Sequence, residues 1–460
     1  MTTPADFSVR GKQVTVVGAA RSGVAAAHLL LRRGATVTLT DTRTEIPEAS
    51  ELAAAGVGLE LGAHRPETLL RSDLVVLSPG VPADQTAVAA ARSAGVHVIG
   101  ELELASRWLR GRIVAITGTK GKSTTTTLTG RMLEAGGHRV LVGGNIGHAL
   151  SAQVDVSTEE TIHVVEASSF QLETIETFRP WIAVLLNFSP DHLDRHATVD
   201  EYAAAKSRIF VNQTATDWAV LNGDDPAVAA LASAALSRRL RFSMTDSLAS
   251  GVLVRGDEIV RRTADGDQRL VPLSSIRLIG QHLIADVLAA SAVASLVGVD
   301  SEAMTRAVEN FKGLEHALEP VGEISGVLFV NDSKATNVEA ARRAIESFPS
   351  IVVIMGGRFK GGDLRDLRQP LLDRRATVIA IGESRALLRE AFADAVPVHE
   401  ADDMSTAVRT AFASAAPGTA VVLAPACASF DMFRDYAERG RVFKQEVTRL
   451  QEEWNSVREQ

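Results

Sequence analysis

The sequence predicts an α/β protein in which parallel sheets form in three successive regions of the chain. Short β-branched runs alternate with helical stretches, and nearly every such run ends in a cluster of Gly, Ser, Asp or Lys. This alternation is typical of βαβ units, whose parallel sheets bind ligands at the carboxyl ends of their strands. The length of 460 residues agrees with about three domains of roughly 150 residues each.

Composition narrows the class of protein. Hydrophobic residues are 46% and charged residues 23%, as in globular proteins that bury several cores. The formal charge of -8 argues against a nucleic-acid-binding protein, although local lysines and backbone N–H groups can still bind anions. Cys427 is the single cysteine, which excludes an intrachain disulfide and a cysteine-rich metal site.

The first ten residues lack the apolar core of a signal peptide, and no stretch approaches the roughly 20 apolar residues of a membrane helix. We therefore expect a cytoplasmic protein without membrane insertion.

The first region contains a weak nucleotide-binding motif. The run Gln13–Val17 meets Gly18-Ala-Ala-Arg-Ser-Gly23, and an Ala/Leu-rich helical stretch follows. This position suits a dinucleotide fingerprint, but Ala20 replaces the glycine that lets a pyrophosphate approach closely, which disfavours a plain NAD site. The next strand, Thr36–Thr40, ends at Asp41, which could contact a ribose or a base. Simple packing of helix on strand is the alternative interpretation.

The second region contains the strongest local motif. The strand Arg112–Thr117 breaks at Gly118-Thr-Lys-Gly-Lys-Ser-Thr124, and a helix follows. A phosphate chain needs backbone N–H donors at close range, a positive end group such as Lys122, and a hydroxyl for Mg²⁺, here Ser123 or Thr124. The strict pattern has four residues between its glycines, whereas this one has two. Nucleotide binding is the favoured interpretation over a glycine turn that only caps a helix.

Further candidate ligands follow the next strands of this region. Glu166 ends a buried strand, and Asp191–His196 follows another. A carboxylate and a neutral imidazole beside a triphosphate are suitable Mg²⁺ ligands, but helix capping or surface packing is the simpler interpretation of His192 and His196. No third soft ligand stands nearby, which disfavours zinc. Lys206 lies on an expected helix, where a lysine taken alone is expected to be solvated.

The third region repeats the pattern of strands that end in polar clusters. Asp332 and Lys334 follow a buried strand, which favours a functional role for both. Lys360 lies on the glycine loop Gly356–Gly361, which could hold a carboxylate or could merely be flexible. The last expected strand leads into Pro425–Phe430.

Taken together, these motifs resemble the Mur ligase family, and within it the members that add glutamate. The resemblance extends in order over essentially the whole chain. The motifs that carry it are Gly118–Thr124, Gly144–Gly147, Glu166–Glu173, Asp191–Arg195, Tyr202–Lys206, Asn331–Asn337, Gly356–Gly361 and Pro425–Asp431. The runs Asn331–Asn337 and Ala426–Ser429 are typical of glutamate-adding members, whereas members that add alanine, diaminopimelate or lysine carry other residues there.

The resemblance implies three domains and one reaction. Residues 1–106 would form a Rossmann-like UDP-binding domain, 107–312 a central P-loop-type ATPase domain with a parallel sheet, and 313–460 a Rossmann-like glutamate-binding domain. The implied enzyme is an ATP-dependent ligase of peptidoglycan precursor synthesis, and so of cell shape and division. It would join D-glutamate to UDP-N-acetylmuramoyl-L-alanine through an acyl phosphate. ATP, two Mg²⁺ ions and a carbamylated Lys206 are expected, and the protein is expected to be a monomer with small-molecule partners only.

The resemblance also assigns roles to individual residues. The catalytic residues would be Lys122, Glu166, His192, Lys206 and Lys334. The ATP-binding residues would be Gly118, Thr119, Lys120, Gly121, Lys122, Ser123, Thr124 and Asp332. The metal ligands would be Ser123, Thr124, Glu166, His192 and Lys206. The UDP-sugar-binding residues would be Ala20, Arg21, Ser22, Asp41, Thr42, Ser78, Pro79, Gly80, Asn145, Ser168, Gln171 and His192. The glutamate-binding residues would be Thr336, Lys360, Ser429, Phe430 and Tyr436.

The implied chemistry needs such a set of residues. A carboxylate must attack a γ-phosphate, so two anions must meet, and Mg²⁺ together with Lys122 would reduce their repulsion. The acyl phosphate supplies a good leaving group for the amine of glutamate. Water must be excluded while it survives, and closure of the third domain onto the second would achieve that.

The sequence departs from the family pattern in three places. The run Gly280–Asp286 carries Leu283 and Asp286 where the family has asparagines, one of them near adenine. Ala317 replaces an arginine near ATP, and Phe359 replaces an aspartate that commonly precedes the lysine of the glutamate site. The adenosine contacts are therefore the least certain part of the expected site.

Two other functions remain open from the sequence. The first is a relative of altered specificity, such as another Mur ligase, an L-glutamate-adding variant or a folylpolyglutamate synthetase. The second is a UDP-sugar-binding protein whose ATP site has decayed. Leu283 and Ala317 would favour this alternative, and it is opposed by the presence of Lys122, Glu166, His192 and Lys206.

Overall fold

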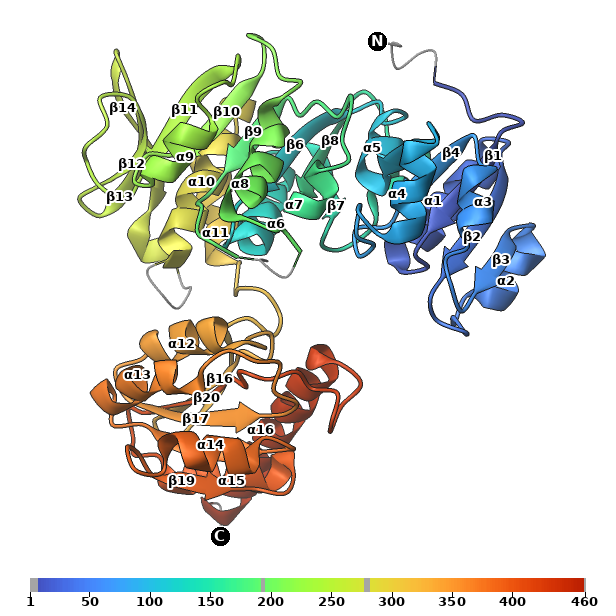
Figure 1. Cartoon of the computed structure of the whole chain (residues 1–460). Coiled ribbons are helices and arrows are strands. Elements are labelled where there is room, and N and C mark those ends of the chain that lie inside the picture. Colours follow the sequence, from blue (N-terminus) through green and yellow to red (C-terminus); the bar gives the residue numbers. More distant parts are fainter. Residues whose placement is uncertain (1–6, 192–194, 277–281, 459–460) are drawn as a thin grey trace. The chain divides into compact units, whose positions relative to one another are not determined.

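The computed structural model of the chain describes residues 7–191, 195–276 and 282–458, without the side chains of residues 282, 457 and 458 (Figure 1). These residues form two compact units, which divide between Phe311 and Lys312. The first unit contains two sheets and the second unit contains one. Each unit is described by itself.

The first sheet is fully parallel, with the strand order β3-β2-β1-β4-β5. Its strands are β1 (Gln13–Val17), β2 (Thr36–Asp41), β3 (Gly58–Leu61), β4 (Leu74–Leu77) and β5 (His97–Gly100). Its helices are α1 (Arg21–Arg32), α2 (Ala49–Ala55), α3 (Pro66–Leu70), α4 (Thr86–Ser93) and α5 (Glu101–Ser106). Successive strand residues point to opposite faces, so Val16 packs toward α1 whereas Val17 packs toward α4. The strand order changes direction between β1 and β4, which places a ligand crevice at their carboxyl ends.

The second sheet has nine strands in the order β14-β13-β12-β11-β10-β9-β6-β8-β7. Its strands are β6 (Arg112–Thr117), β7 (Arg139–Gly144), β8 (Thr161–Glu166), β9 (Ile182–Leu185), β10 (Trp218–Asn222), β11 (Arg238–Ser243), β12 (Gly251–Arg255), β13 (Glu258–Thr263) and β14 (Gly266–Pro272). Strands β7 to β12 pair in parallel, and β13 and β14 are antiparallel additions at one edge. Strand β6 lies between β8 and β9 and is parallel to both, so the carboxyl ends of these three strands lie at the same edge.

Helices cover both faces of the second sheet. They are α6 (Lys122–Ala135), α7 (Ser169–Leu172), α8 (Val199–Ser207), α9 (Pro226–Leu231), α10 (His282–Val297) and α11 (Ser301–Glu309), with the 3₁₀ turns η2 (Leu150–Val156), η3 (Arg208–Phe210) and η4 (Leu273–Ser275). Every residue of β6 after Arg112 is buried, as expected for a strand between two helical layers. Helix α6 begins where β6 ends, and it packs against α10 and α11.

Helix α5 joins the first sheet to the second through two buried glutamates. Glu103 accepts hydrogen bonds of 2.9 to 3.0 Å from the backbone N–H groups of residues 176–178. Burial alone would raise the pKa of Glu103, but these bonds and the neighbouring Arg107 together hold that pKa below its usual value. Glu101 accepts a 2.6 Å hydrogen bond from the backbone N–H of Ser151. The two sheets of the first unit are therefore tied by buried polar contacts.

The sheet of the second unit has the order β15-β16-β20-β17-β18-β19 and is parallel except for β15. Its strands are β15 (Glu319–Ile324), β16 (Val327–Asn331), β17 (Ile351–Gly356), β18 (Thr377–Ile381), β19 (Val398–Glu400) and β20 (Ala420–Leu423). Its helices are α12 (Val338–Glu346), α13 (Arg368–Asp373), α14 (Arg385–Phe392), α15 (Met404–Ser414) and α16 (Tyr436–Arg458), with the 3₁₀ turn η5 (Leu364–Leu367). Val353 and Met355 pack on one face, Val352 and Ile354 on the other.

The predicted α/β class is confirmed, and so are most of the predicted buried strands. The predicted run Ala420–Leu423 coincides with β20, and the helix expected after Thr124 is α6. Strands at or near the sheet edges, such as β3 and β15, were not identified because their residues are mixed in polarity. Within the described residues, no helix is long and apolar enough to cross a membrane.

Candidate active site

The loop between β6 and α6 has a backbone that only glycine permits at two positions. Gly121 adopts φ +79°, and a Cβ added there would overlap Asp286 Oδ1. A Cβ on Gly118 would lie 2.9 Å from that of Leu186. The loop therefore lies tightly against its surroundings and leads directly into the N-terminus of α6, where backbone N–H groups can bind an anion.

Two lysines converge on this loop. Lys122 Nζ donates to the carbonyl oxygens of Gly118 at 3.0 Å and Thr119 at 2.9 Å. Lys206 Nζ donates to the same Gly118 oxygen at 2.7 Å. The side chain of Lys206 is buried, so the simple expectation of a solvated lysine is wrong.

The environment of Lys206 lowers the pKa of its ammonium group. Burial, followed by repulsion from Lys122, lowers the pKa of Lys206 to about 7, although Asp191 and Glu166 oppose the shift. The amine is therefore substantially neutral near physiological pH, and a neutral amine is a nucleophile.

Glu166 lies beside the start of α6 and accepts hydrogen bonds from two other predicted site residues, Ser123 and Asn145. Its Oε2 accepts a 2.7 Å hydrogen bond from Ser123 Oγ, and its Oε1 accepts a 2.8 Å bond from Asn145 Nδ2. Glu166 is buried at the carboxyl end of β8, as its place in the sequence predicts. Thr124 follows Ser123 on the first turn of α6. A hydroxyl and a carboxylate at this spacing are oxygen ligands of the kind that Mg²⁺ prefers.

The segment after β9 holds the loop through hydrogen bonds. Asn187 exchanges two hydrogen bonds with the backbone of Lys120, at 2.9 and 3.1 Å. Thr119 Oγ1 donates to the carbonyl of Ser189 at 3.0 Å. Sequence reasoning missed Asn187 as a support of the loop, although it ends a buried strand like the residues that were singled out.

Asp286 supports the start of α6, a role that its residue type alone does not predict. Its Oδ1 accepts a 3.1 Å hydrogen bond from Thr125 Oγ1 on α6. Burial raises the pKa of Asp286 to about 8, with the Thr125 bond opposing the shift. The departure from asparagine at this position therefore leaves a carboxyl that is mostly neutral at pH 7, with one donor and one acceptor as in an amide.

The predicted UDP-binding residues gather at the carboxyl ends of β1, β2 and β4. Asp41 Oδ2 accepts a 2.6 Å hydrogen bond from the backbone N–H of Ala19, and Arg43 binds both of its oxygens. These contacts, led by the Arg43 side chain, hold the pKa of Asp41 well below its usual value. Ser78 Oγ donates to the carbonyl of Gly18 at 2.8 Å. The remaining predicted members at this crevice are Ala20, Arg21, Ser22, Thr42, Pro79 and Gly80.

Helix α7 presents two other predicted UDP-sugar residues. Ser168 caps the helix, and the Gln171 side-chain oxygen accepts a hydrogen bond from the backbone N–H of Ser168, which completes a capping box. Gln171 Nε2 is buried and finds no hydrogen-bond partner among the described residues. A buried amide donor without a partner is costly, and a bound ligand would satisfy it.

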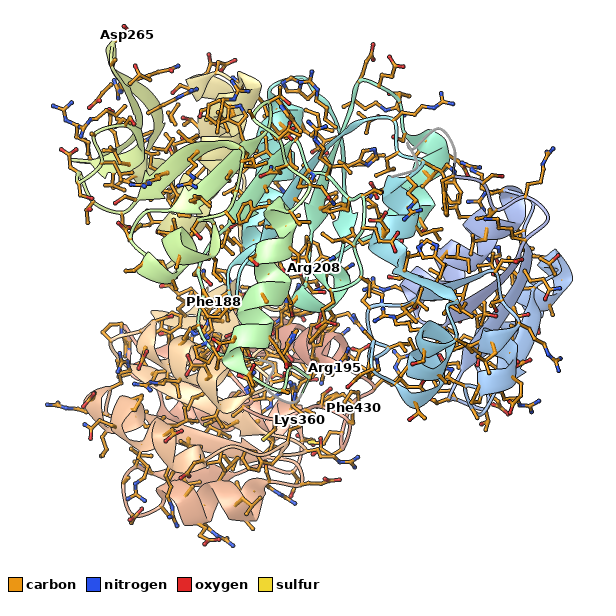
Figure 2. All side chains as sticks on the ribbon, turned by 45° about the horizontal axis from the view of Figure 1, so that its top comes forward. Phe188, Arg195, Arg208, Asp265, Lys360 and Phe430 are labelled. Atoms are coloured by element: carbon orange, nitrogen blue, oxygen red, sulfur yellow. The ribbon has the colours of Figure 1, made fainter. Side chains whose placement is uncertain are left out.

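The two predicted histidines differ in outcome. His192 lies outside the described residues. His196 is buried between α7 and α8, so the expected surface packing is wrong, and Thr198 rather than His196 caps α8. Figure 2 shows Phe188, Arg195 and Arg208 beside α8.

In the second unit, three loops bring predicted glutamate-binding residues together. Lys360 Nζ donates to Thr336 Oγ1 at 3.3 Å. The loop of Lys360 pairs with the loop after β20, through backbone bonds between Arg358 and Ala428. Phe430 and Lys360 are both exposed (Figure 2). Of the other predicted residues, Ser429 is buried and Tyr436 is exposed.

Asp332 and Lys334 follow β16 as predicted, in different environments. Asp332 is buried and accepts a 3.2 Å hydrogen bond from the backbone N–H of Leu318. Burial raises the pKa of Asp332 to about 7, although that bond and Lys334 oppose the shift. Lys334 is exposed, whereas Phe359 is partly buried and packs against a hydrophobic cluster of the second unit.

Arg439 was not singled out from the sequence, yet it joins these loops. Its buried guanidinium donates to the side chain and carbonyl of Ser333 at 2.9 and 2.8 Å, and to the carbonyl of Cys427 at 3.1 Å. Ser333 precedes Lys334, and Cys427 precedes Ser429. An arginine within a helix that is otherwise rich in charge carries no sequence feature that would mark it as buried.

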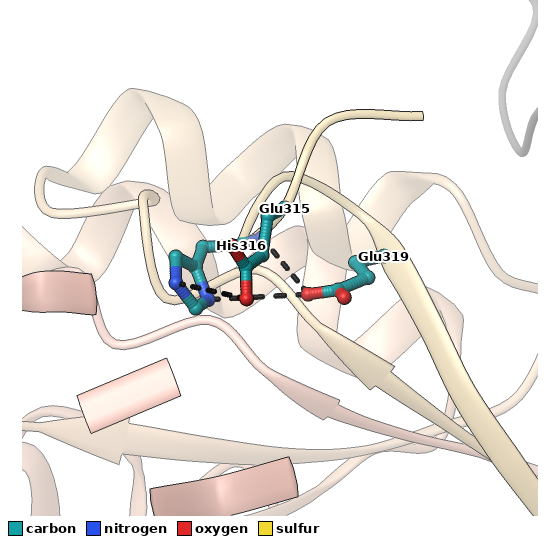
Figure 3. A group of neighbouring side chains, drawn as sticks. All are labelled: Glu315, His316 and Glu319. Carbon is teal, nitrogen blue, oxygen red and sulfur yellow. Dashed lines mark hydrogen bonds and ion pairs between the residues drawn. The ribbon is translucent and has the colours of Figure 1, made fainter. Parts of the chain in front are cut away.

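A cluster of potential metal ligands lies elsewhere in the second unit. Glu315, His316 and Glu319 place one ligand atom each within 4.8 Å of the others (Figure 3). Lys444 Nζ already donates to Glu315 at 3.1 Å and to Glu319 at 2.6 Å. A lysine ammonium thus already pairs with both carboxylates, and the cluster forms an ion-pair network.

Comparison with known families gives the class of protein. Three family profiles match in chain order: "Mur ligase MurD-like, N-terminal domain" over residues 12–100, "Mur ligase middle domain" over 116–294 and "Mur ligase, glutamate ligase domain" over 318–427. The chain belongs to the Mur ligase family, and its fold is the three-domain α/β fold of that family.

Within the family, the chain is similar to D-glutamate ligases. The UDP-N-acetylmuramoylalanine--D-glutamate ligase of Acidobacterium capsulatum is 47% identical over 444 residues, which cover 95% of this chain and 96% of that protein. The ligase of the same name from Koribacter versatilis is 44% identical over 97% of this chain and 99% of that protein.

Solved structures show the same fold. A UDP-N-acetylmuramate-alanine ligase from Thermotoga maritima matches with a TM-score of 0.59 and 18% identity, over 95% of this chain and 99% of that one. A pseudomurein peptide ligase type C from Methanothermus fervidus matches with a TM-score of 0.58 and 16% identity, over 96% and 100%.

The close fit of the loop predicts that Gly121→Ala loses nucleotide binding. The methyl group would overlap Asp286 Oδ1, and a shift of the loop that relieves the overlap would displace its N–H groups from the phosphates, so Mg·ATP affinity should fall about tenfold or more. The control is Gly137→Ala, at the other end of α6, where φ is also positive at +82° but no atom lies within 4 Å of the new methyl. Isothermal titration calorimetry measures both affinities. Equal losses in the two variants would contradict a specific role for the Gly121 contact.

Proposed function

We propose that the chain is the ATP-dependent ligase that joins UDP-N-acetylmuramoyl-L-alanine to D-glutamate. The observation that carries this proposal is the cluster at the carboxyl ends of β6 and β8. The loop between β6 and α6, residues 118–121, is called the phosphate loop below. Around it and the N-terminus of α6 lie Lys122, Lys206 and the hydrogen-bonded pair Ser123–Glu166. The family is ATP-dependent and generally needs Mg²⁺. The similarity to D-glutamate ligases along nearly the whole chain supports the choice of substrates.

In this proposal the phosphate loop holds ATP. Backbone N–H groups of residues 118–124 and the ammonium of Lys122 bind the phosphates, and Asp332 contacts the ribose. The carboxylate of the UDP-sugar substrate attacks the γ-phosphate, ADP leaves, and an acyl phosphate results. The amine of glutamate then attacks the acyl carbon, loses a proton, and releases inorganic phosphate as the amide forms. Lys334 acts near the reacting groups.

The residues fit a bound Mg²⁺. Ser123, Thr124 and Glu166 offer hard oxygen ligands, and the Ser123–Glu166 hydrogen bond already brings two of them together. His192 and Lys206 are proposed to serve a second ion. Bound Mg²⁺ would neutralise phosphate charge as the two anions approach each other.

We also assign a carbamate to Lys206. A metal ligand must offer a lone pair, and an ammonium group has none. The neutral amine could attack carbon dioxide and lose a proton, giving an anionic carbamate whose oxygens could bind a metal. The lowered pKa of Lys206 and the burial of its side chain support this step.

The proposal also assigns residues that bind the UDP-sugar and residues that bind glutamate. The residues at β1, β2 and β4, with Asn145 and helix α7, bind the UDP-sugar, and the buried Gln171 amide without a described partner supports that role. The paired loops of the second unit bind glutamate through Thr336, Lys360, Ser429, Phe430 and Tyr436. We also propose the domain boundaries 1–106, 107–312 and 313–460, a monomeric state, and the cytoplasm, where ATP and UDP-sugars are made, as the site of action.

Phosphate release tests the proposed reaction. Purified protein is incubated with ATP and Mg²⁺, with or without UDP-N-acetylmuramoyl-L-alanine, and with D-glutamate, L-glutamate or no amino acid. We expect release that depends on both the nucleotide sugar and D-glutamate, and its loss in Lys122→Ala because the phosphates lose their charged partner. A preference for L-glutamate would keep the mechanism and change the specificity. Sugar binding without any release would instead identify a protein with a decayed ATP site.

Carbamylation has a spectroscopic test. Protein equilibrated with ¹³C-labelled bicarbonate should show one carbamate carbonyl resonance, which is absent in Lys206→Met. Because the amine is neutral above its pKa of about 7, the resonance should be stronger at about pH 8 than at about pH 6. No difference between the wild type and Lys206→Met would contradict the assignment.

A further inference from the structure

His196 occupies a buried position between two helices of the first unit. It lies two residues before Thr198, the cap of α8, and its side chain is only 3% exposed. His196 Nε2 lies 3.0 Å from Ser169 Oγ, and its Nδ1 lies 3.1 Å from Glu173 Oε1. With Glu173 ionised, Nδ1 carries the proton and Nε2 accepts from Ser169. The imidazole therefore binds both ends of helix α7, which runs from Ser169 to Leu172.

Aromatic contacts extend this attachment on both sides. The imidazole stacks on the ring of Phe170 with centroids 5.4 Å apart and contacts the ring of Tyr202 at 5.1 Å. The guanidinium of Arg195 lies 4.3 Å from the Phe170 ring on α7, and it donates to the carbonyl of Gly80 at 3.3 Å. Gly80 belongs to the crevice at the first sheet.

Tyr202 carries the contact onward to the phosphate loop. Its hydroxyl donates to Thr119 Oγ1 at 3.4 Å, and its ring lies 4.6 Å from Lys206 Nζ. Lys206 in turn donates to the carbonyl of Gly118. A continuous set of contacts thus runs from α7 through His196 and Tyr202 to the loop.

We propose that His196 is a positioning residue, which holds helix α7 in register with the phosphate loop so that a nucleotide sugar bound at α7 presents its carboxylate to the phosphates. The inference rests on the proposed function, because Ser168 and Gln171 on α7 are the residues assigned to that substrate. His196 itself needs no contact with either substrate. A helix of four residues has little stability of its own, so external contacts must fix its position.

The chain offers a matched control for a purely structural role. His163 is also buried and also bridges two side chains, with Nε2 2.8 Å from Ser157 Oγ and Nδ1 2.8 Å from Gln153 Oε1. These partners lie in η2 and just after it, away from α7. Loss of this bridge should lower stability without a selective effect on substrate.

The experiment compares His196→Ala, His196→Gln and His163→Gln with the wild type. Titration calorimetry gives the dissociation constants of UDP-N-acetylmuramoyl-L-alanine and of Mg·ADP, and phosphate release gives kcat. For His196→Ala we expect the dissociation constant of the nucleotide sugar to rise about tenfold, the equivalent of one buried hydrogen bond, and kcat to fall by a similar factor. The dissociation constant of Mg·ADP should change less than about twofold, because Asn187 and Asp286 still hold the loop.

A conservative replacement and a double variant sharpen the test. A glutamine amide can donate to Glu173 and accept from Ser169, so His196→Gln should recover most of the sugar affinity. Ser169→Ala should raise the same dissociation constant, and adding it to His196→Ala should have little further effect, because His196→Ala has already removed the bond between the two side chains. Ser169→Ala deletes a single oxygen, so it carries the test if His196→Ala does not fold.

Three results would overturn the inference. One is a His196→Ala protein whose sugar affinity and kcat stay within about twofold of the wild type. Another is equal weakening of sugar and Mg·ADP binding in His196→Ala and His163→Gln, which would mean general destabilisation. A wild-type protein that binds no nucleotide sugar would overturn the proposed function and this inference with it, whereas the first two results overturn the inference alone.

Discussion

The side-chain amines of two lysines share the carbonyl oxygen of Gly118, and the rest of the candidate site depends on this close approach of two basic groups. Lys122 and Lys206 reach the loop from α6 and α8, and their repulsion, added to burial, lowers the pKa of Lys206. Such a loop favours a polyanion, because bound phosphates would relieve the repulsion. It also leaves one of the two amines largely neutral, which is the state that permits covalent modification. Phosphate binding and the chemistry of Lys206 therefore have one physical origin.

Polar contacts, rather than apolar packing alone, hold this partly buried glycine loop in place. Asn187 holds the loop backbone at Lys120, Asp286 accepts a hydrogen bond from Thr125 on α6, and Glu166 holds the first turn of α6 through Ser123. Each contact comes from a different strand or helix, so the geometry depends on the whole second sheet. Buried polar groups that are fully paired fix a unique arrangement, whereas one broken contact leaves a costly unpaired group. Burial raises the pKa of Asp286 to about 8, so its carboxyl is mostly neutral at pH 7 and can both donate and accept a hydrogen bond.

Sequence reasoning recovered the features that local patterns encode. Buried parallel strands such as β4 and β20 are continuous apolar runs, and the glycines of the loop are required by backbone geometry, so both could be predicted. Side-chain environments that depend on distant segments could not. Lys206 is buried because α8 packs over the loop, and His196 is buried because Ser169 and Glu173 return from another part of the chain. Edge strands such as β3 were missed for a related reason, since a half-exposed strand needs no apolar run.

If this loop supports the transfer of a phosphoryl group to a carboxylate, the released phosphate must contain an oxygen atom of that carboxylate. UDP-N-acetylmuramoyl-L-alanine labelled with ¹⁸O in its carboxylate is turned over with ATP, Mg²⁺ and D-glutamate, and the phosphate is analysed by mass spectrometry. In the acyl phosphate one carboxylate oxygen bridges carbon and phosphorus. This oxygen leaves with the phosphate when the amine attacks the acyl carbon, so we expect one ¹⁸O atom in each phosphate released. Unlabelled phosphate, formed alongside the amide product, would contradict it.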